Sequence, residues 1–234
     1  MNVHTPRAVY VALALCALTT GASVVFAQST PHPSSGLTTR SESSHRDENR
    51  LIVEVFDYSQ VSPRTLEEAE QVASGIFARA GVDLLWTDCV EGGKPQPYAE
   101  CDAPMGDEQV GVRILPHIPL LKGIRGDGTL GFTVGDLSTV SLERAEEASA
   151  NVRGSLSDLL GCAIAHELGH VLLGPHSHSA FGLMQGRWDV NALLAAARHG
   201  LFFAPEEAAT IRVVVLARTL PSAALAGVTP TSGK

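Results

Sequence analysis

His166-Glu167-Leu168-Gly169-His170 is the stretch of this sequence that decides how the rest of the chain is interpreted. On a helix, two histidines four residues apart lie on the same face, about one turn from each other. Two imidazoles so placed can share one tetrahedral ion such as Zn²⁺, and a glutamate directly after the first histidine can act as a base beside it. The spacing therefore predicts a metal site on a helix, for which the surrounding sequence must supply a third ligand.

The residues around this stretch predict a helix with defined ends. Before it, Ser155 and Asp158 stand three positions apart, which is the spacing of a capping box at a helix start. After it, Gly174 and Pro175 predict the helix end, because glycine tolerates a left-handed conformation there and proline cannot continue a helix. The two histidines therefore fall in the last two turns, where a returning loop can bring the third ligand.

The segment 166–184 resembles the metzincins, zinc peptidases whose signature H-E-x-x-H-x-x-G-x-x-H is followed by a turn containing methionine. His166 and His170 match the first two zinc ligands of that family, and Glu167 matches its catalytic glutamate. Met184 matches the methionine of the turn, which the resemblance implies to be a hydrophobic floor under the metal. The segment also resembles a group of uncharacterised exported bacterial zincin-like proteins, with their Leu-Leu-Gly helix end and His-Ser pair.

The third ligand is ambiguous because the glycine of the signature is displaced by one position. The family's glycine position falls on Leu173, and the glycine of this chain is Gly174. His176 keeps the family's linear distance from the first histidine, whereas His178 follows the glycine by four positions and precedes a serine, as in many family members. We favour His178 as the third zinc ligand and keep His176 as the alternative.

Other side chains could also complete the site. Glu206 or Glu207 on a later helix would give the ligand set of a gluzincin, and Asp189 is another carboxylate candidate. Cys162 lies one turn before the first histidine, but a cysteine among apolar residues is more typical of a buried core position. The adjacent pair of histidines favours an imidazole over these residues.

The rest of the chain predicts an α+β domain. Apolar residues alternate in the predicted strands 51–58, 82–86, 110–115, 130–134 and 139–142, and they recur at helical spacing in the predicted helices 63–80, 156–173, 189–199 and 205–218. We expect a twisted mixed β-sheet with a backing helix, an active-site helix and a small helical C-terminal subdomain. This is the zincin/metzincin-like fold that the resemblance implies.

Both ends of the chain are expected to lie outside this domain. Residues 1–27 combine a basic start, an apolar run too short to span a bilayer and a small residue, Ala27, which is the pattern of a signal peptide. Residues 28–49 predict a disordered leader and 221–234 a flexible tail, which leaves 50–220 for the metallopeptidase domain. Cleavage near Ala27 would release the protein to the periplasm or the extracellular space; an uncleaved N-terminal anchor is the alternative. No later segment approaches the roughly 18 apolar residues that a membrane helix needs.

Composition and cysteines narrow the set of partners. The chain has 17 Lys and Arg against 25 Asp and Glu, a net charge of −8, and no basic cluster, which argues against nucleic acid and anionic membranes. In an exported protein, Cys89 and Cys101 can close a short loop, so we expect a disulfide between them, with two unpaired thiols as the alternative. The sequence leaves the oligomeric state open.

Together these features predict a secreted zinc-dependent endopeptidase that acts on a peptide or protein substrate. Three imidazoles would leave one zinc position open, and the ion would lower the pKa of a water held there to about 7. Glu167 would take the proton of that water and deliver it to the leaving amine. Segment 130–134 is a candidate edge strand for the peptide, or else an ordinary core strand. The alternative function is a catalytically inactive zincin-like module that binds zinc or protein.

Overall fold

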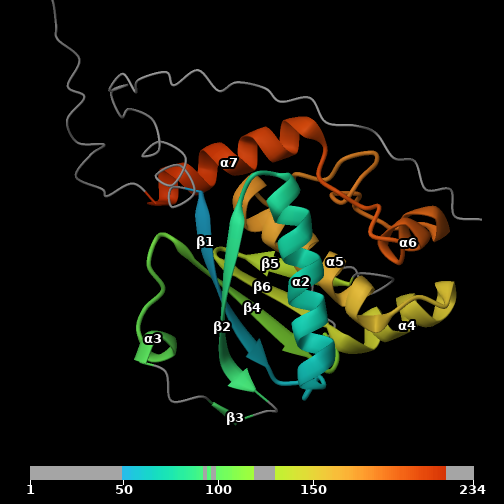
Figure 1. Cartoon of the computed structure of the whole chain (residues 1–234), viewed down its shortest axis with the longest axis horizontal. Coiled ribbons are helices and arrows are strands. Elements are labelled where there is room, and N and C mark those ends of the chain that lie inside the picture. Colours follow the sequence, from blue (N-terminus) through green and yellow to red (C-terminus); the bar gives the residue numbers. More distant parts are fainter. Residues whose placement is uncertain (1–48, 92–93, 96–98, 119–129, 220–234) are drawn as a thin grey trace, which may run out of the picture. The chain divides into compact units, whose positions relative to one another are not determined.

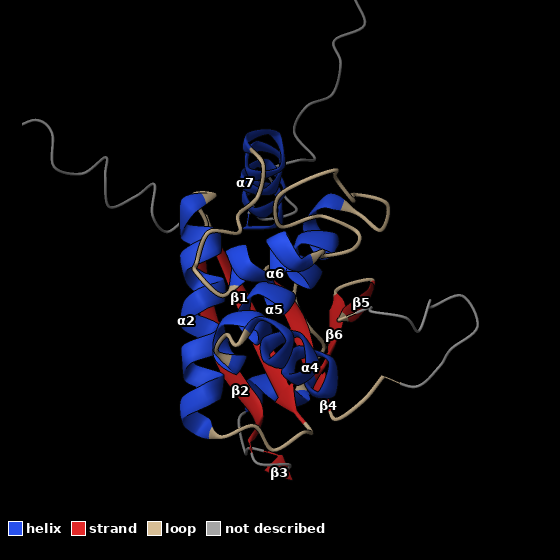
Figure 2. Cartoon of the chain, turned by 90° about the vertical axis from the view of Figure 1, so that its right-hand side faces the viewer, coloured by secondary structure: helices blue, strands red, loops and turns tan. Residues whose placement is uncertain are grey.

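The computed structural model describes residues 49–91, 94–95, 99–118 and 130–219. The predicted signal peptide, almost all of the leader and the predicted tail lie outside the described residues. Within them, a mixed β-sheet carries helices α2 and α5 on one face (Figures 1 and 2), which confirms the α+β class.

The sheet has six strands in the order β3-β2-β1-β4-β6-β5. Its strands are β1 (Arg50–Asp57), β2 (Asp83–Glu91), β3 (Lys94–Pro95), β4 (Gln109–Leu115), β5 (Gly131–Val134) and β6 (Leu137–Ser141). The four central strands are parallel, and the edge strands β3 and β5 are antiparallel to their neighbours. All the predicted strands are thus present, and the sheet has one further short strand, β3, that was not predicted.

The helices are α2 (Pro63–Arg79), α3 (Ala99–Asp102), α4 (Leu142–Val152), α5 (Leu156–Leu173), α6 (Val190–Ala196) and α7 (Pro205–Thr219). Helix α2 begins as predicted, because the Ser62 hydroxyl accepts a hydrogen bond from the Thr65 backbone N–H at 3.1 Å. Its apolar stripe faces the sheet and α5, where Phe77 is fully buried.

Helix α4 was not predicted from the sequence. Its buried side chains are small, Ala145, Ala148 and Ser149, so the chain offers little apolar periodicity over this segment. The helix nevertheless begins at a Ser141 cap and ends at Arg153, whose φ of 52° is left-handed. Capping signals therefore define this helix better than hydrophobicity does.

Helix α5, which carries the histidine pair, forms the centre of the core. Leu159, Leu160 and Ile164 are fully buried on it, and by length and composition alone it is apolar enough to cross a membrane. The expectation that no later segment would pass that test is therefore wrong, but 72% of this helix is buried inside the protein, so its apolar character belongs to the core. The predicted capping bond is also absent: Ser155 stands at the cap, but its hydroxyl contacts the Ser157 hydroxyl at 2.6 Å.

Two further features hold the fold around α5. Cys89 of β2 and Cys101 of α3 form the predicted disulfide, with an S–S distance of 2.03 Å. At the other end of the domain, Ile211 and Val215 of α7 are fully buried in the same core cluster as α5. The C-terminal helices therefore share one core with the sheet.

Candidate metal centre

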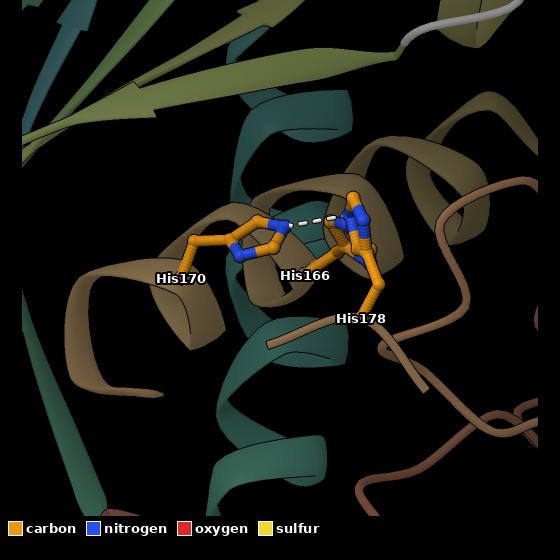
Figure 3. A group of neighbouring side chains, drawn as sticks. All are labelled: His166, His170 and His178. Carbon is orange, nitrogen blue, oxygen red and sulfur yellow. Dashed lines mark hydrogen bonds between the residues drawn. The ribbon is translucent and has the colours of Figure 1, made fainter. Parts of the chain in front are cut away.

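His166, His170 and His178 come together at the end of α5 and in the loop that follows it, as Figure 3 shows. Their ligand nitrogens all lie within 4.8 Å of one another, and Nε2 of His170 is 3.0 Å from Nε2 of His178. Two nitrogens on one tetrahedral zinc ion are about 3.3 Å apart, given zinc–nitrogen distances of about 2.0–2.1 Å. The spacing and the all-imidazole donor set therefore fit Zn²⁺.

The outer nitrogens of the two helix histidines are held by hydrogen-bond acceptors. Nδ1 of His166 lies 2.7 Å from the backbone oxygen of Leu183, and Nδ1 of His170 lies 3.2 Å from the backbone oxygen of Gly174 and 3.0 Å from the Ser177 hydroxyl. Because a carbonyl oxygen can only accept, we assign the proton of each ring to Nδ1. This tautomer leaves the lone pair of Nε2 available for a metal ion.

Burial keeps these two rings neutral. It lowers the pKa of His166 to about 4, a shift opposed by the hydrogen bond to Leu183 and increased by the neighbouring His170 and His178. Burial also lowers the pKa of His170, with His178 adding to the shift. Neutral imidazole is the form that binds metal, so this environment suits both rings to that role at neutral pH.

The structure separates the two candidates for the third ligand. His178 belongs to the three-histidine group, whereas His176 lies outside the group on the preceding turn; both side chains are exposed. The ring of His178 packs over Gly186, where an added Cβ would lie 2.9 Å from its Nδ1. The loop is closed by a 2.9 Å hydrogen bond from the Ser179 backbone N–H to the Met184 backbone oxygen.

The other candidate ligands from the sequence do not belong to this group. Asp189 caps the start of α6, where its side chain accepts a 2.9 Å hydrogen bond from the Ala192 backbone N–H. Glu207, in the first turn of α7, accepts a 2.7 Å hydrogen bond from the backbone N–H of Ala204, the residue before that helix. Glu206 is exposed in the first turn of α7. Cys162 is buried in the core, where burial and then Asp158 raise the pKa of its thiol to about 12.

Glu167 is almost completely buried against strand β5, with 4% of its surface exposed. The Thr133 hydroxyl lies 2.9 Å from its Oε2 and 3.0 Å from its backbone oxygen. Burial raises the pKa of Glu167 to about 8, and the bond from Thr133 opposes this shift. Gly131 makes the approach possible, because a Cβ there would lie 2.8 Å from Oε1.

Met184 lies fully buried beneath α5. Its sulfur faces Gly169, where an added Cβ would lie only 2.5 Å from Sδ. The preceding Leu183 supplies the backbone oxygen that holds His166. The turn therefore supports the histidine pair both through packing and through a hydrogen bond.

The sequence analysis did not predict two contacts of the site, one made by Thr133 and one by Trp188. Thr133 is 34 positions away from Glu167, and its only signal was the alternation that places it on the same strand face as Gly131. Trp188 lies with its ring centre 5.8 Å from that of His166, and its Nε1 donates to the Leu183 backbone oxygen at 3.2 Å. Neither residue belongs to the histidine motif, so the motif alone does not reveal them.

No family model and no curated protein matches the chain. Solved structures that are similar to it include two zinc peptidases. A zinc-dependent peptidase from Methanocorpusculum labreanum has a TM-score of 0.46 at 13% identity, over 68% of this chain and 99% of that one. Archaemetzincin from Methanopyrus kandleri has a TM-score of 0.47 at 13% identity, over 76% of this chain and 99% of that one. An identity of 13% and TM-scores below 0.5 carry no inference about the chemistry of the site. That chemistry must be inferred from the residues of this chain.

Proposed function

We propose that this chain is an exported zinc-dependent endopeptidase. The observation that carries the proposal is that Glu167, a buried carboxyl group, directly follows His166 on α5, and that His166 belongs to a group of three histidines whose ligand nitrogens lie within 4.8 Å of one another. His166, His170 and His178 would hold the ion. Bound there, Zn²⁺ would polarise a substrate carbonyl and make a water molecule more acidic.

Glu167 would act as the general base and then as the general acid. Its carboxylate takes one proton from the water as the water oxygen attacks the carbonyl carbon of the peptide bond. It then gives that proton to the amide nitrogen, so that the C–N bond breaks and a neutral amine leaves. A non-enzymatic zinc module needs the histidines but has no use for this carboxylate, so the buried glutamate favours the enzyme.

The substrate class we propose is an extended peptide. Strand β5 stands at the end of the strand order, and among the described residues it pairs only with β6. The outer edge of such a strand offers backbone N–H and C=O groups to an added strand. Because Thr133 of β5 contacts Glu167, a peptide added there would pass close to the proposed base.

Export is proposed from the pattern of residues 1–27 and from cysteine use. A disulfide such as Cys89–Cys101 persists in oxidising compartments and is rare in the cytosol. The periplasm or the extracellular space therefore fits the chemistry of the domain.

The purified chain tests the proposal through metal content and cleavage of an unfolded protein. We expect one zinc ion per chain and cleavage that a chelator abolishes and added zinc restores. Glu167→Gln should keep the zinc and lose turnover by at least the factor of about 10²–10⁴ that general acid–base catalysis contributes. Zinc without cleavage in the unmodified chain would instead indicate a binding module, and a chain without zinc would refute both zinc functions.

A further inference from the structure

The bond between Thr133 and Glu167 joins two elements that are far apart in the sequence. Thr133 lies in the edge strand β5 and Glu167 in helix α5, and the hydroxyl reaches both the side-chain Oε2 and the backbone oxygen of Glu167. A hydroxyl has one proton to donate, and a carboxylate and a carbonyl oxygen can only accept. Thr133 is therefore the donor in this contact.

The donor is itself held in place. Ser138 of β6 is the register partner of Thr133 across the β5–β6 pair, and the two hydroxyl oxygens are 3.1 Å apart. Since the Thr133 proton faces Glu167, the Ser138 hydroxyl donates to Thr133. Ser138 is fully buried, so a chain of hydroxyls runs from the interior of the sheet to the carboxylate.

The strand also leaves room for the second carboxylate oxygen. Gly131 lies two positions before Thr133 and thus on the same face of β5. A Cβ at that position would lie 2.7 Å from Cγ and 2.8 Å from Oε1 of Glu167. In strand β5, therefore, the Thr133 hydroxyl binds Oε2, and Gly131 leaves space for Oε1 because it has no side chain.

We propose that Thr133 is a positioning residue for Glu167. Its hydroxyl fixes Oε2 against the edge strand, so that Oε1 is the oxygen that exchanges a proton with a molecule bound at the metal centre. This inference rests on the proposed function, because it gives Glu167 the role of base. It adds that the edge strand sets the orientation of the base as well as offering its outer edge to a substrate.

Three variants separate positioning from packing. Thr133→Val keeps the shape of the side chain and removes the hydroxyl, whereas Thr133→Ser keeps the hydroxyl and removes a methyl group. Thr133→Val in the Glu167→Ala background tests whether the hydroxyl acts through the carboxylate. Urea unfolding of each variant verifies that it is folded before any comparison is made.

The first readout does not depend on turnover. The chain is loaded with Co²⁺, and acetohydroxamate is titrated while the visible absorption of the ion is followed, because this ligand releases a proton that a nearby carboxylate can take. We expect Thr133→Val to keep Co²⁺ and to weaken acetohydroxamate binding by about 10–100-fold, the usual effect of removing a supporting hydrogen bond. Thr133→Ser should bind as the unmodified chain does, and Thr133→Val should have no further effect when Glu167 is alanine.

The second readout is peptide cleavage, where kcat should fall in Thr133→Val with KM unchanged, and Thr133→Ser should restore kcat. Equal acetohydroxamate affinity in Thr133→Val and the unmodified chain would refute the inference while leaving the proposed function intact. Equal losses in the valine and serine variants would also refute it, since they would indicate packing alone. Conversely, if the hydroxamate results hold and no peptide is cleaved, the positioning role stands and the peptidase function fails. A chain that binds no Co²⁺ would refute both.

Discussion

His176 and His178 are only two positions apart and are both exposed, yet only His178 belongs to the three-histidine group. The difference arises from the loop, which the Ser179–Met184 backbone bond closes, and from Gly186, which leaves space for the His178 ring. Linear distance from the first histidine favours His176, so counting positions along the chain does not identify the residue that reaches the site.

The two histidines therefore give a matched pair of variants. His178→Ala should weaken zinc binding by more than the 10–100-fold typical of a supporting residue, because it removes a donor atom. His176→Ala should leave zinc affinity unchanged, since that side chain lies outside the three-histidine group. Competition with a chromophoric chelator measures both affinities, and a reversed order would make His176 the third ligand.

At the scale of secondary-structure elements, α5 was predicted well and α4 was not. The end of α5 follows from a strong local signal, the Gly174-Pro175 stop, and its start lies at Ser155 as predicted, although the serine hydroxyl makes no capping bond. Helix α4 buries only small side chains, so hydrophobic periodicity could not reveal it. The strands were predicted from alternation, but their order in the sheet depends on contacts between distant segments, which the pattern of one strand does not contain.

The same distinction applies to the site. The three histidines that could hold a metal ion lie in one short segment, so a motif could indicate them. Thr133, in contrast, meets Glu167 through the pairing of β5 with the sheet and the packing of α5 against it. A partner of this kind becomes visible only when the register of the strands is known.

Two helical glycines give a prediction for the packing of α5. In Gly169→Ala the new methyl would meet Met184 Sδ at 2.5 Å and a ring carbon of Phe203 at 2.9 Å, so we expect a loss of about 1–3 kcal/mol in the free energy of unfolding. Gly75→Ala on α2 meets nothing within 4 Å and should gain about 0.5–1 kcal/mol. Urea denaturation compares the two, and equal effects would mean that Met184 does not pack tightly under α5.

At the scale of the whole molecule, the pH dependence of stability reflects acidic groups held between α2 and β2. Burial raises the pKa of Glu70 to about 8, and Asp88 and then Glu67 add to the shift. The folded state therefore holds a proton on this group that the unfolded state releases above its ordinary pKa of 4.5. The contribution of Glu70 is fully present at acidic pH and is lost as the pH rises toward 8.

Glu70→Gln should remove this contribution. We expect the variant to lose less stability than the unmodified chain between pH 5 and pH 8.5, by about 1–2 kcal/mol after allowance for solvent screening. Urea unfolding across this pH range measures the difference, with Glu146→Gln on the exposed surface of α4 as the control. Identical pH profiles for Glu70→Gln and the unmodified chain would show that Glu70 is not the responsible group.

The closeness of the three histidines along the chain has a consequence for thermodynamic linkage. An unfolded ensemble also contains the segment 166–178 with all three imidazoles, so it competes with the native state for the same ion. A ligand that binds both states shifts the melting temperature by less than its affinity for the native state would suggest. The contact between Thr133 and Glu167, by contrast, exists only after β5 and α5 have met, so the unfolded ensemble has no counterpart of it. Metal affinity therefore reports mainly on this local segment, whereas the position of the carboxylate reports on the completed fold.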